Sequence, residues 1–282
     1  MKKVKKPIRN ILCKILEPLF SKKFIKHYIT PFLVLKKKVP YNAKEYFESW
    51  HKSTFNHEFS ARVTISPYYN VLFSRFHYNA VENSILKYLV RPGMGSRARI
   101  LDIGSGSGYW IDFYTDLFDP QLITGVEISE VCVNALKNKY RDKKNVKIAV
   151  GDISQADFEL KETFDLINAV GVMFHIIEDK DWETALSNLG KHLNPRGIIV
   201  VGGQFGRITR DVQFHAKDRF STWGETANPT SNRVLVNKRI RSLRYWKRCA
   251  HRNGLKVSAL IKTQRDSRIQ TPENNILILT QS

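Results

Sequence analysis

The 282-residue chain has few cysteines and no long apolar run. Its three cysteines, Cys13, Cys132 and Cys249, are too far apart for a disulfide framework or a Cys-x-x-Cys metal pattern, which fits a reducing cytoplasm. No stretch approaches the roughly 20 apolar residues that a membrane-spanning helix needs. The chain begins with lysines, as a signal peptide does, but charges interrupt its apolar positions and no small-residue cleavage site follows. We therefore expect a cytoplasmic protein without a metal site.

Acidic residues are also scarce: 26 Asp and Glu stand against 46 Lys and Arg, for a formal net charge of +20. The excess is confined to two segments. Residues 1–40 hold twelve basic side chains against Glu17 alone, and residues 207–254 hold twelve against three acids. Such a charge indicates an anionic acceptor, nucleic acid or anionic lipid as a partner, and it says nothing about the fold.

Residues 1–95 are basic and rich in aromatic residues, and we predict a helical extension there. Apolar side chains recur at helical spacing over 8–20, and a second apolar cluster precedes the three lysines at 36–38. The segment 8–35 is typical of an interfacial helix on an anionic membrane. It is equally typical of a helix that packs on its own domain or on a second subunit. Peripheral membrane contact through residues 1–40 is thus one of the interpretations that stay open, and the sequence does not predict the oligomeric state.

From residue 98 onward, short apolar runs alternate with amphipathic stretches, which is the pattern of βαβ units and a parallel sheet. We predict strands over 98–103, 121–127, 146–150, 164–170 and 197–202, and helices over 107–118, 129–141 and 180–193. An irregular, basic insertion is expected at about 203–237, followed by a helix over 238–252. Strands over 255–263 and 275–281 are predicted to pair as a hairpin at the edge of the sheet.

The most informative segment is Ile-Leu-Asp-Ile-Gly-Ser-Gly-Ser-Gly at 100–108. A buried strand runs into a glycine-rich turn that opens a helix, so that backbone amides can approach a ligand at the positive end of the helix dipole. Glu127 ends the next predicted strand, 19 residues after Gly108, where an acid can bind both hydroxyls of a ribose. Asp102 would repel a pyrophosphate but suits a cationic amino-acid group. These features indicate a cofactor that contains a nucleoside.

The acid-x-Gly-x-Gly-x-Gly pattern at 102–108 resembles the first motif of the class I S-adenosylmethionine-dependent methyltransferases. The resemblance spans about 98–206. Glu127 is similar to the ribose-binding acid of that family, and Asp152 in Gly-Asp-Ile at 151–153 matches the position that meets the adenine amino group. Phe-Asp-Leu-Ile at 164–167 resembles the start of the family's fourth strand, and Leu-Asn-Pro-Arg-Gly at 193–197 resembles its turn into the fifth.

This resemblance implies an α/β fold with a Rossmann-like, seven-stranded methyltransferase sheet, mostly parallel with an antiparallel last strand, and an N-terminal helical extension or cap. It implies that residues 1–95 cap the substrate and that residues 96–282 form an S-adenosylmethionine-binding methyltransferase domain. The cofactor that the resemblance implies is S-adenosyl-L-methionine. The implied cofactor-binding residues are Asp102, Gly104, Ser105, Gly106, Gly108, Glu127, Ile128, Asp152, Ile153, Ala169 and Val170.

His175 follows the fourth predicted strand, which faces the methyl group in this family, and is our candidate catalytic base because a neutral imidazole is available near pH 7. It could equally be a histidine that only packs at the loop. Glu178 and Asp179 could orient it, or could simply be the N-terminal acids of the following helix. The alternatives to His175 lie in the flanking regions: His51, His57, His77 and His215.

The motifs of methyltransferases that act on base amines, on base carbon and on protein arginine are absent. What remains resembles the sugar, lipid and small-molecule O- and N-methyltransferases. An anion-and-ring pocket, or merely a solvated basic face, could come from Arg207, Arg210, Arg219, Trp223 and Arg233.

We therefore expect O-methylation of a saccharide or lipid-linked saccharide, with a small-molecule or glycan acceptor that can be anionic. The alternatives are a small-molecule natural-product methyltransferase, an RNA methyltransferase that grips phosphates with the basic flanks, and a non-catalytic partner subunit. Nucleic acid is the weaker expectation because no Asp ends the fourth predicted strand.

Overall fold

The computed structural model describes residues 41–54, 71–90, 94–215, 235–263 and 275–282. The chain divides into two compact units, Met1–Tyr41 and Asn42–Ser282. The helix predicted over 8–35 lies outside the described residues. No helix among the described residues is both long and apolar enough to cross a membrane.

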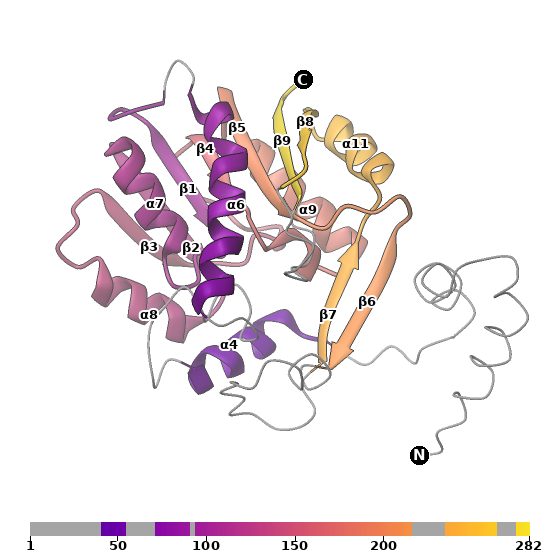
Figure 1. Ribbon diagram of the computed structural model, residues 1–282, viewed down its shortest axis with the longest axis horizontal. Helices are drawn as coiled ribbons and strands as arrows, with labels where there is room; N and C mark the ends of the chain where they lie inside the picture. Colours follow the sequence, from indigo (N-terminus) through magenta and orange to yellow (C-terminus); the bar gives the residue numbers. More distant parts are fainter. Residues whose placement is uncertain (1–40, 55–70, 91–93, 216–234, 264–274) are drawn as a thin grey trace, which may run out of the picture. The chain divides into compact units, whose positions relative to one another are not determined.

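The unit Asn42–Ser282 is built on a seven-stranded sheet in the order β3-β2-β1-β4-β5-β9-β8 (Figure 1). Neighbouring strands from β3 to β5 pair in parallel, whereas β9 is antiparallel to both β5 and β8. The predicted sheet and its antiparallel last strand are therefore confirmed. The strands are β1 (Arg99–Ile103), β2 (Leu122–Glu127), β3 (Val146–Val150), β4 (Phe164–Asn168), β5 (Leu193–Gly203), β8 (Leu255–Ile261) and β9 (Asn275–Gln281).

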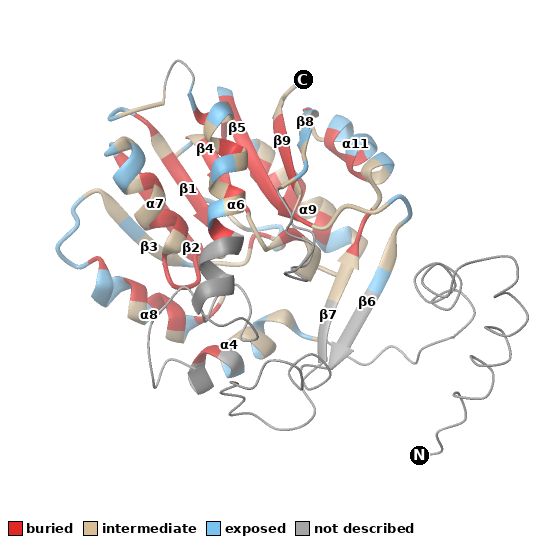
Figure 2. Ribbon diagram, viewed as in Figure 1, coloured by how far each residue is buried: buried red, intermediate tan, exposed pale blue. Residues whose placement is uncertain are grey.

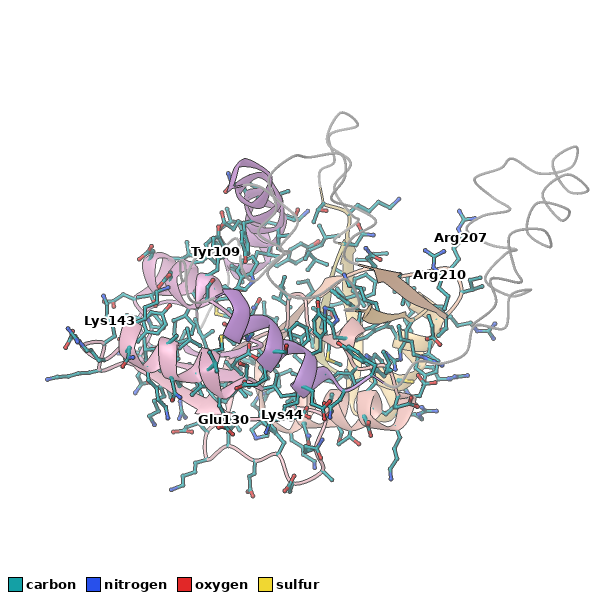
Figure 3. The ribbon with its side chains drawn as sticks, turned by 90° about the horizontal axis from the view of Figure 1, so that it is seen from below. Lys44, Tyr109, Glu130, Lys143, Arg207 and Arg210 are labelled. Atoms are coloured by element: carbon teal, nitrogen blue, oxygen red, sulfur yellow. The ribbon has the colours of Figure 1, made fainter. Side chains whose placement is uncertain are left out.

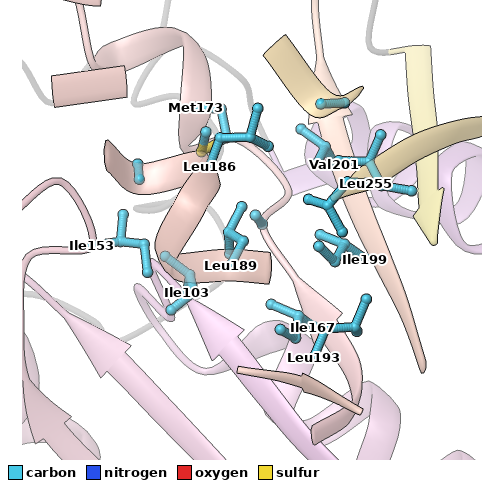
Figure 4. Packing of buried hydrophobic residues seen from close by; sticks show 14 of the residues in the cluster. Ile103, Ile153, Ile167, Met173, Leu186, Leu189, Leu193, Ile199, Val201 and Leu255 are labelled. Atoms are coloured by element: carbon cyan, nitrogen blue, oxygen red, sulfur yellow. The ribbon is translucent and has the colours of Figure 1, made fainter. Parts of the chain in front are cut away.

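Helices cover both faces of this sheet because successive strand residues point to opposite sides. Ile100 belongs to the buried cluster under α6 (Val71–Leu89), α7 (Tyr109–Phe118) and α8 (Glu130–Lys139), whereas Leu101 belongs to the cluster under α9 (Asp179–Lys191) and α11 (Leu243–Arg252). The central strands are buried almost throughout (Figure 2). In the second cluster Leu186 and Leu189 of α9 lie among side chains of the sheet (Figure 4).

The fifth strand begins earlier than the sequence predicted, at Leu193 instead of residue 197. Pro195 and Gly197 indicated a turn there. In the structure Phe164 pairs with Leu193, and the register then shifts before Leu166 pairs with Ile198. A bulge of this kind accommodates a proline within a strand, because the missing N–H need not join the ladder.

The prediction of an irregular insertion at about 203–237 was wrong at its two ends. β6 (Arg210–His215) and β7 (Leu235–Ile240) form a separate two-stranded antiparallel sheet. The helix predicted from residue 238 begins only at Leu243, because residues 235–240 are strand and Ser242 caps α11, its Oγ accepting from the Tyr245 N–H at 3.2 Å. Residues 216–234, which include Arg219, Trp223 and Arg233, lie outside the described part of the chain.

Candidate cofactor and acceptor site

The glycine turn after β1 has a backbone that only glycine adopts easily. Gly104, Gly106 and Gly108 have φ values of 70°, 52° and 80°, in the left-handed region. The Gly104 N–H donates to the Val126 carbonyl of β2 at 2.8 Å, which sets the turn against the neighbouring strand. A Cβ on Gly108 would lie 2.2 Å from Tyr140 Oη. Two constraints, conformation and space, therefore require glycine at 108.

Two side chains that follow one another near the end of α8 hold the carbonyls of this turn. Lys139 Nζ donates to the Ser107 carbonyl at 3.0 Å, and Tyr140 Oη donates to the Gly108 carbonyl at 2.9 Å. Lys139 Nζ also donates to the carboxylate of Asp112 at 2.6 Å, and the Tyr140 hydroxyl shares its one hydrogen between the Gly108 carbonyl and Asp112 Oδ1, which lies 2.8 Å away. No sequence pattern marks these contacts, because a Lys-Tyr pair carries no signal of such a role.

Glu127 lies at the end of β2 and is 5% exposed. Its Oε2 accepts from the Gly106 N–H at 3.0 Å, and its Oε1 accepts from the N–H groups of Ile128 and Ser129 at 2.8 and 3.2 Å. Burial raises the pKa of Glu127, and these three bonds oppose the rise. A carboxylate has about four acceptor positions, so capacity remains for a ligand hydroxyl. Ser129 in turn donates to Glu48 Oε2 at 2.7 Å, which ties helix α4 (Ala43–Thr54) to this end of the sheet.

A buried hydrogen-bonded chain ends on Asp102. Tyr114 Oη donates to Asn168 Oδ1 at 3.1 Å, and Asn168 Nδ2 donates to Asp102 Oδ1 at 2.7 Å. All three residues are 0% exposed, and Asp102 Oδ2 has no partner within the described residues. Burial raises the pKa of Asp102 to about 7. Asn168 ends β4 and pairs in register with Asp102 of the adjacent strand β1, so that its amide holds the Asp102 carboxylate.

The other predicted cofactor residues differ in their surroundings. Ser105 is buried and its Oγ donates to the Asp102 carbonyl at 3.0 Å. Asp152 takes part in a local turn, where Oδ1 accepts from the Ser154 N–H at 2.9 Å and Oδ2 accepts from Gln155 Nε2 at 3.1 Å. The structure therefore brings together Asp102, the glycine turn and Glu127. The carboxylate of Asp152 is instead engaged in hydrogen bonds within its own turn. Of the remaining residues, two are buried, Ile153 and Ala169, and two are half-buried, Ile128 and Val170.

His175 ends the short helix η2 (Met173–His175) after β4 and is half-buried. Its ring meets Phe47 of α4 edge-on, with the ring centroids 5.1 Å apart, and lies 4.5 Å from the Phe174 ring. His51, one turn along α4, also packs on Phe47, at 6.2 Å. Burial lowers the pKa of His51 to about 4, against the opposing charge of Glu48. Of the predicted alternatives to His175, the structure describes the side chain of His51 alone.

The η2 segment touches the glycine turn. A Cβ on Gly104 would lie 2.5 Å from Val172 Cγ2, and the Val172 carbonyl accepts from the His175 N–H at 2.9 Å. The candidate base therefore sits three residues from a direct contact with the cofactor turn. In Figure 1, α4 lies beyond the end of the sheet at which this turn and η2 meet.

A buried arginine fixes the chain that follows η2. Arg241 is 1% exposed and stacks over the Trp182 ring at 4.6 Å. Its Nη1 donates to the Ile176 carbonyl at 2.9 Å, and its Nη2 donates to the Ile177 carbonyl at 3.2 Å. Its Nε donates to Asp179 Oδ1 at 3.0 Å. The junction of β7 and α11 thus holds the loop that carries His175.

The two acids that follow His175 are not placed as partners that orient its ring. Asp179 pairs with Arg241 and also accepts from Arg239 Nη2 at 3.0 Å. Glu178 is exposed at the start of α9 and its side chain makes no cap. Of the predicted anion pocket, Arg207 is exposed on the connection between β5 and β6, near Arg210 (Figure 3).

These features define a class: a parallel sheet with one antiparallel strand, a glycine turn after β1, and buried acids at the ends of β1 and β2. Residues 100–197 match the model of a methyltransferase domain. This part of the chain is therefore similar to a methyltransferase domain, and the strand order of the sheet is the one that the resemblance to the class I, S-adenosylmethionine-dependent enzymes implies.

Individual relatives are distant. The chain is 29% identical to malonyl-[acyl-carrier protein] O-methyltransferase of Bacillus anthracis over 150 residues, which cover 53% of this chain and 51% of that protein. It is 27% identical to demethylmenaquinone methyltransferase of Staphylococcus aureus over 122 residues, which cover 42% of this chain and 49% of that protein. The chain therefore spans about half the length of the curated relatives it matches.

Among solved structures, magnesium protoporphyrin IX methyltransferase (ChlM) of Synechocystis PCC 6803 with bound S-adenosylhomocysteine (SAH) aligns with a TM-score of 0.58. The alignment covers 85% of this chain and 100% of that one at 14% identity. A likeness at such identity shows the fold.

Proposed function

We propose that the protein transfers a methyl group from S-adenosyl-L-methionine to an oxygen of a small-molecule acceptor. The observation that carries this proposal is the pair of buried carboxylates, Asp102 and Glu127, on either side of the glycine turn. The methyltransferase relatives and the bound S-adenosylhomocysteine of the ChlM structure support the same cofactor.

The residues present fit this cofactor. Asp102 Oδ2 is a buried carboxylate oxygen without a partner in the described chain, and an ammonium group would satisfy it. Glu127 keeps acceptor capacity beyond its three backbone bonds, as ribose hydroxyls require. The bound cofactor would supply an already activated methyl group, so the protein has to align the acceptor and remove its proton.

His175 is the residue we assign to proton removal, and the acceptor we propose is a saccharide or lipid-linked saccharide. The rings of Phe47 and Phe174 contact the imidazole, and His51 also packs on Phe47. Aromatic walls beside a histidine favour a ring-shaped acceptor whose hydroxyl can reach the imidazole. The low pKa of His51 keeps its ring neutral at pH 7, so His51 would contact the acceptor without taking up its proton.

Calorimetry with SAH and transfer of radiolabel from S-adenosylmethionine to fractionated lysate test the proposal. We expect SAH to bind and one fraction of small molecules to take up label. Once the acceptor is isolated, His175→Ala should lower kcat by about 100-fold or more, the usual size of a general-base contribution. His51→Ala is the matched control, expected to raise KM more than it lowers kcat. A kcat within a few-fold of wild type in His175→Ala would remove the assignment, and absence of SAH binding would remove the proposed function.

A further inference from the structure

Helix α7 carries a buried hydroxyl to which the proposed methyl transfer assigns no role. Tyr114 Oη donates to Asn168 Oδ1 at 3.1 Å, and this is its one hydrogen bond within the described residues. Asn168 Nδ2 donates in turn to Asp102 Oδ1 at 2.7 Å. All three residues are 0% exposed, so solvent offers them no alternative partners. The hydroxyl thus reaches the acid of the glycine turn through a single amide.

The sheet places the three side chains on one of its faces. Ile100 of β1 and Leu166 of β4 pair in register and belong to the buried cluster that includes Tyr114. Asp102 and Asn168 follow them by two residues, again in register, and residues two apart in a strand point to the same face. The contact between the amide and the carboxylate is therefore set by β1 and β4, and the helix that covers this face supplies the hydroxyl.

The orientation of the Asn168 amide decides which form of Asp102 it can bind. An amide has an NH₂ group that donates and an oxygen that accepts, and the two ends are similar in size. In the observed orientation Nδ2 faces the carboxyl, and an ionised Asp102 accepts its hydrogen. In the reversed orientation Oδ1 would face the carboxyl, and only a protonated Asp102 could donate to it. Tyr114 favours the observed orientation, because its hydroxyl hydrogen would lose its acceptor in the reversed one.

The charged and titratable groups around the pair come from four elements. Burial raises the pKa of Asp102 to about 7; the charge of Glu127 on β2 adds to this rise, and hydrogen bonding to the amide opposes it. Tyr114 of α7 keeps its hydrogen, because burial and the charges of Asp102 and of Glu82 on α6 raise its pKa. Burial also raises the pKa of Tyr140 on α8. These groups are acids or neutral hydroxyls, so the amide is the donor that favours the ionised carboxyl.

We propose that Tyr114 and Asn168 are positioning residues that hold Asp102 as a carboxylate, with Oδ2 left for the ammonium group of the cofactor. Tyr114 acts through Asn168, whose amide it keeps in the donating orientation. Only an amide suits position 168, because an aspartate there would put two carboxyl groups side by side, and such a pair retains a proton. The inference rests on the proposed function, since it takes the ligand of Asp102 to be the ammonium group of S-adenosylmethionine.

Calorimetric titration of the full-length wild type and of Tyr114→Phe with SAH, from pH 6 to pH 9 at constant ionic strength, tests this role. Without the hydroxyl both amide orientations become available, so the protonated carboxyl gains an acceptor and the pKa of Asp102 should increase by about one unit. The Kd of the variant relative to wild type should therefore be about tenfold higher at pH 6 and about equal at pH 9. The amino group of SAH titrates alike with both proteins, and the ratio of the two Kd values removes its contribution.

Two further variants separate positioning from packing. Asn168→Asp keeps the size of the side chain and replaces the donor by a second carboxyl, so its Kd at pH 7 should be at least about tenfold above that of wild type. Tyr245→Phe is the matched control, because it removes a hydroxyl that donates to Glu183 Oε1 at 2.9 Å on the other face of the sheet; its Kd ratio should stay near one at every pH.

The outcomes distinguish this inference from the proposed function. A Kd ratio of Tyr114→Phe that is the same at every pH means that Tyr114 only packs, and overturns its positioning role. Wild-type affinity in Asn168→Asp at pH 7 overturns the role of the amide. Absence of SAH binding by wild type at every pH removes the proposed function itself.

Discussion

Cofactor affinity should fall as Asp102 takes up a proton. The carboxyl is 0% exposed, and burial raises its pKa to about 7. Its Oδ2 has no partner among the described residues, so an ammonium group would bind the ionised form and lose its counter-charge on the protonated one. The affinity for S-adenosylhomocysteine should therefore decrease between pH 8 and pH 6.

The magnitude follows from the pKa. With a pKa of about 7, the carboxyl is about 90% ionised at pH 8 and about 10% ionised at pH 6. The apparent affinity should therefore drop by roughly tenfold, which corresponds to about 1.4 kcal/mol. His51 contributes nothing to this window, because its pKa of about 4 keeps it neutral throughout.

Calorimetric titration with SAH at constant ionic strength measures this slope. Asp102→Asn is the matched control, because the amide keeps the size of the side chain and cannot ionise. The variant should bind more weakly than wild type at pH 8 and show a flat profile down to pH 6. If wild type binds equally at both pH values, or if the variant keeps the same slope, then Asp102 does not meet the ammonium group.

Three further outcomes follow from the same geometry. Because the pKa of Asp102 is raised in the folded state, the fold loses stability as pH increases from about 4 to 7. Without cofactor, Asp102→Asn should therefore have a higher Tm than wild type above pH 7. Below pH 4 the two proteins should have the same Tm. Gly104→Ala would place a side chain at a φ of 70° with its Cβ 2.5 Å from Val172, and this variant should lose SAH binding. Gly171→Ala is the control, because Gly171 has a φ of 87° but open space around it; it should lower the free energy of unfolding in urea by only roughly 1 kcal/mol. Arg241→Met should cost about 3–5 kcal/mol in the same assay, whereas Arg252→Met, which breaks a half-exposed ion pair, should change the unfolding midpoint little.

The sequence predicted the parts of the fold that repeat a local pattern. Alternating apolar runs located all seven strands of the main sheet, and the spacing of Asp102, the glycines and Glu127 located the turn between them. These features are local because a strand, a tight turn and a helix start each depend on a few neighbouring residues. The carboxyl ends of parallel strands then bring them to one edge of the sheet without further information.

The groups that complete the site come from far apart in the chain, and no local pattern marks them. Asn168 reaches Asp102 across 66 positions, and Ser129 reaches Glu48 across 81. Asn168 is in fact visible as a polar residue at the end of a buried strand, a signal that favours a structural hydrogen bond as much as a catalytic one. The β6–β7 pair was missed because basic residues such as Lys238 and Arg239 do not show the alternation of a half-buried strand.

Part of the positive charge of residues 207–254 stabilises the fold and does not form a surface for a ligand. Counted in sequence, residues 207–254 indicated a surface that meets an anion. In the structure Arg241 is buried and holds the loop after η2, and Arg239 divides its charge between two aspartates. A count of arginines therefore does not separate those that stabilise the fold from those that could bind an anion. What distinguishes the two is whether the donors of the guanidinium already have partners within the protein, and those of Arg241 do.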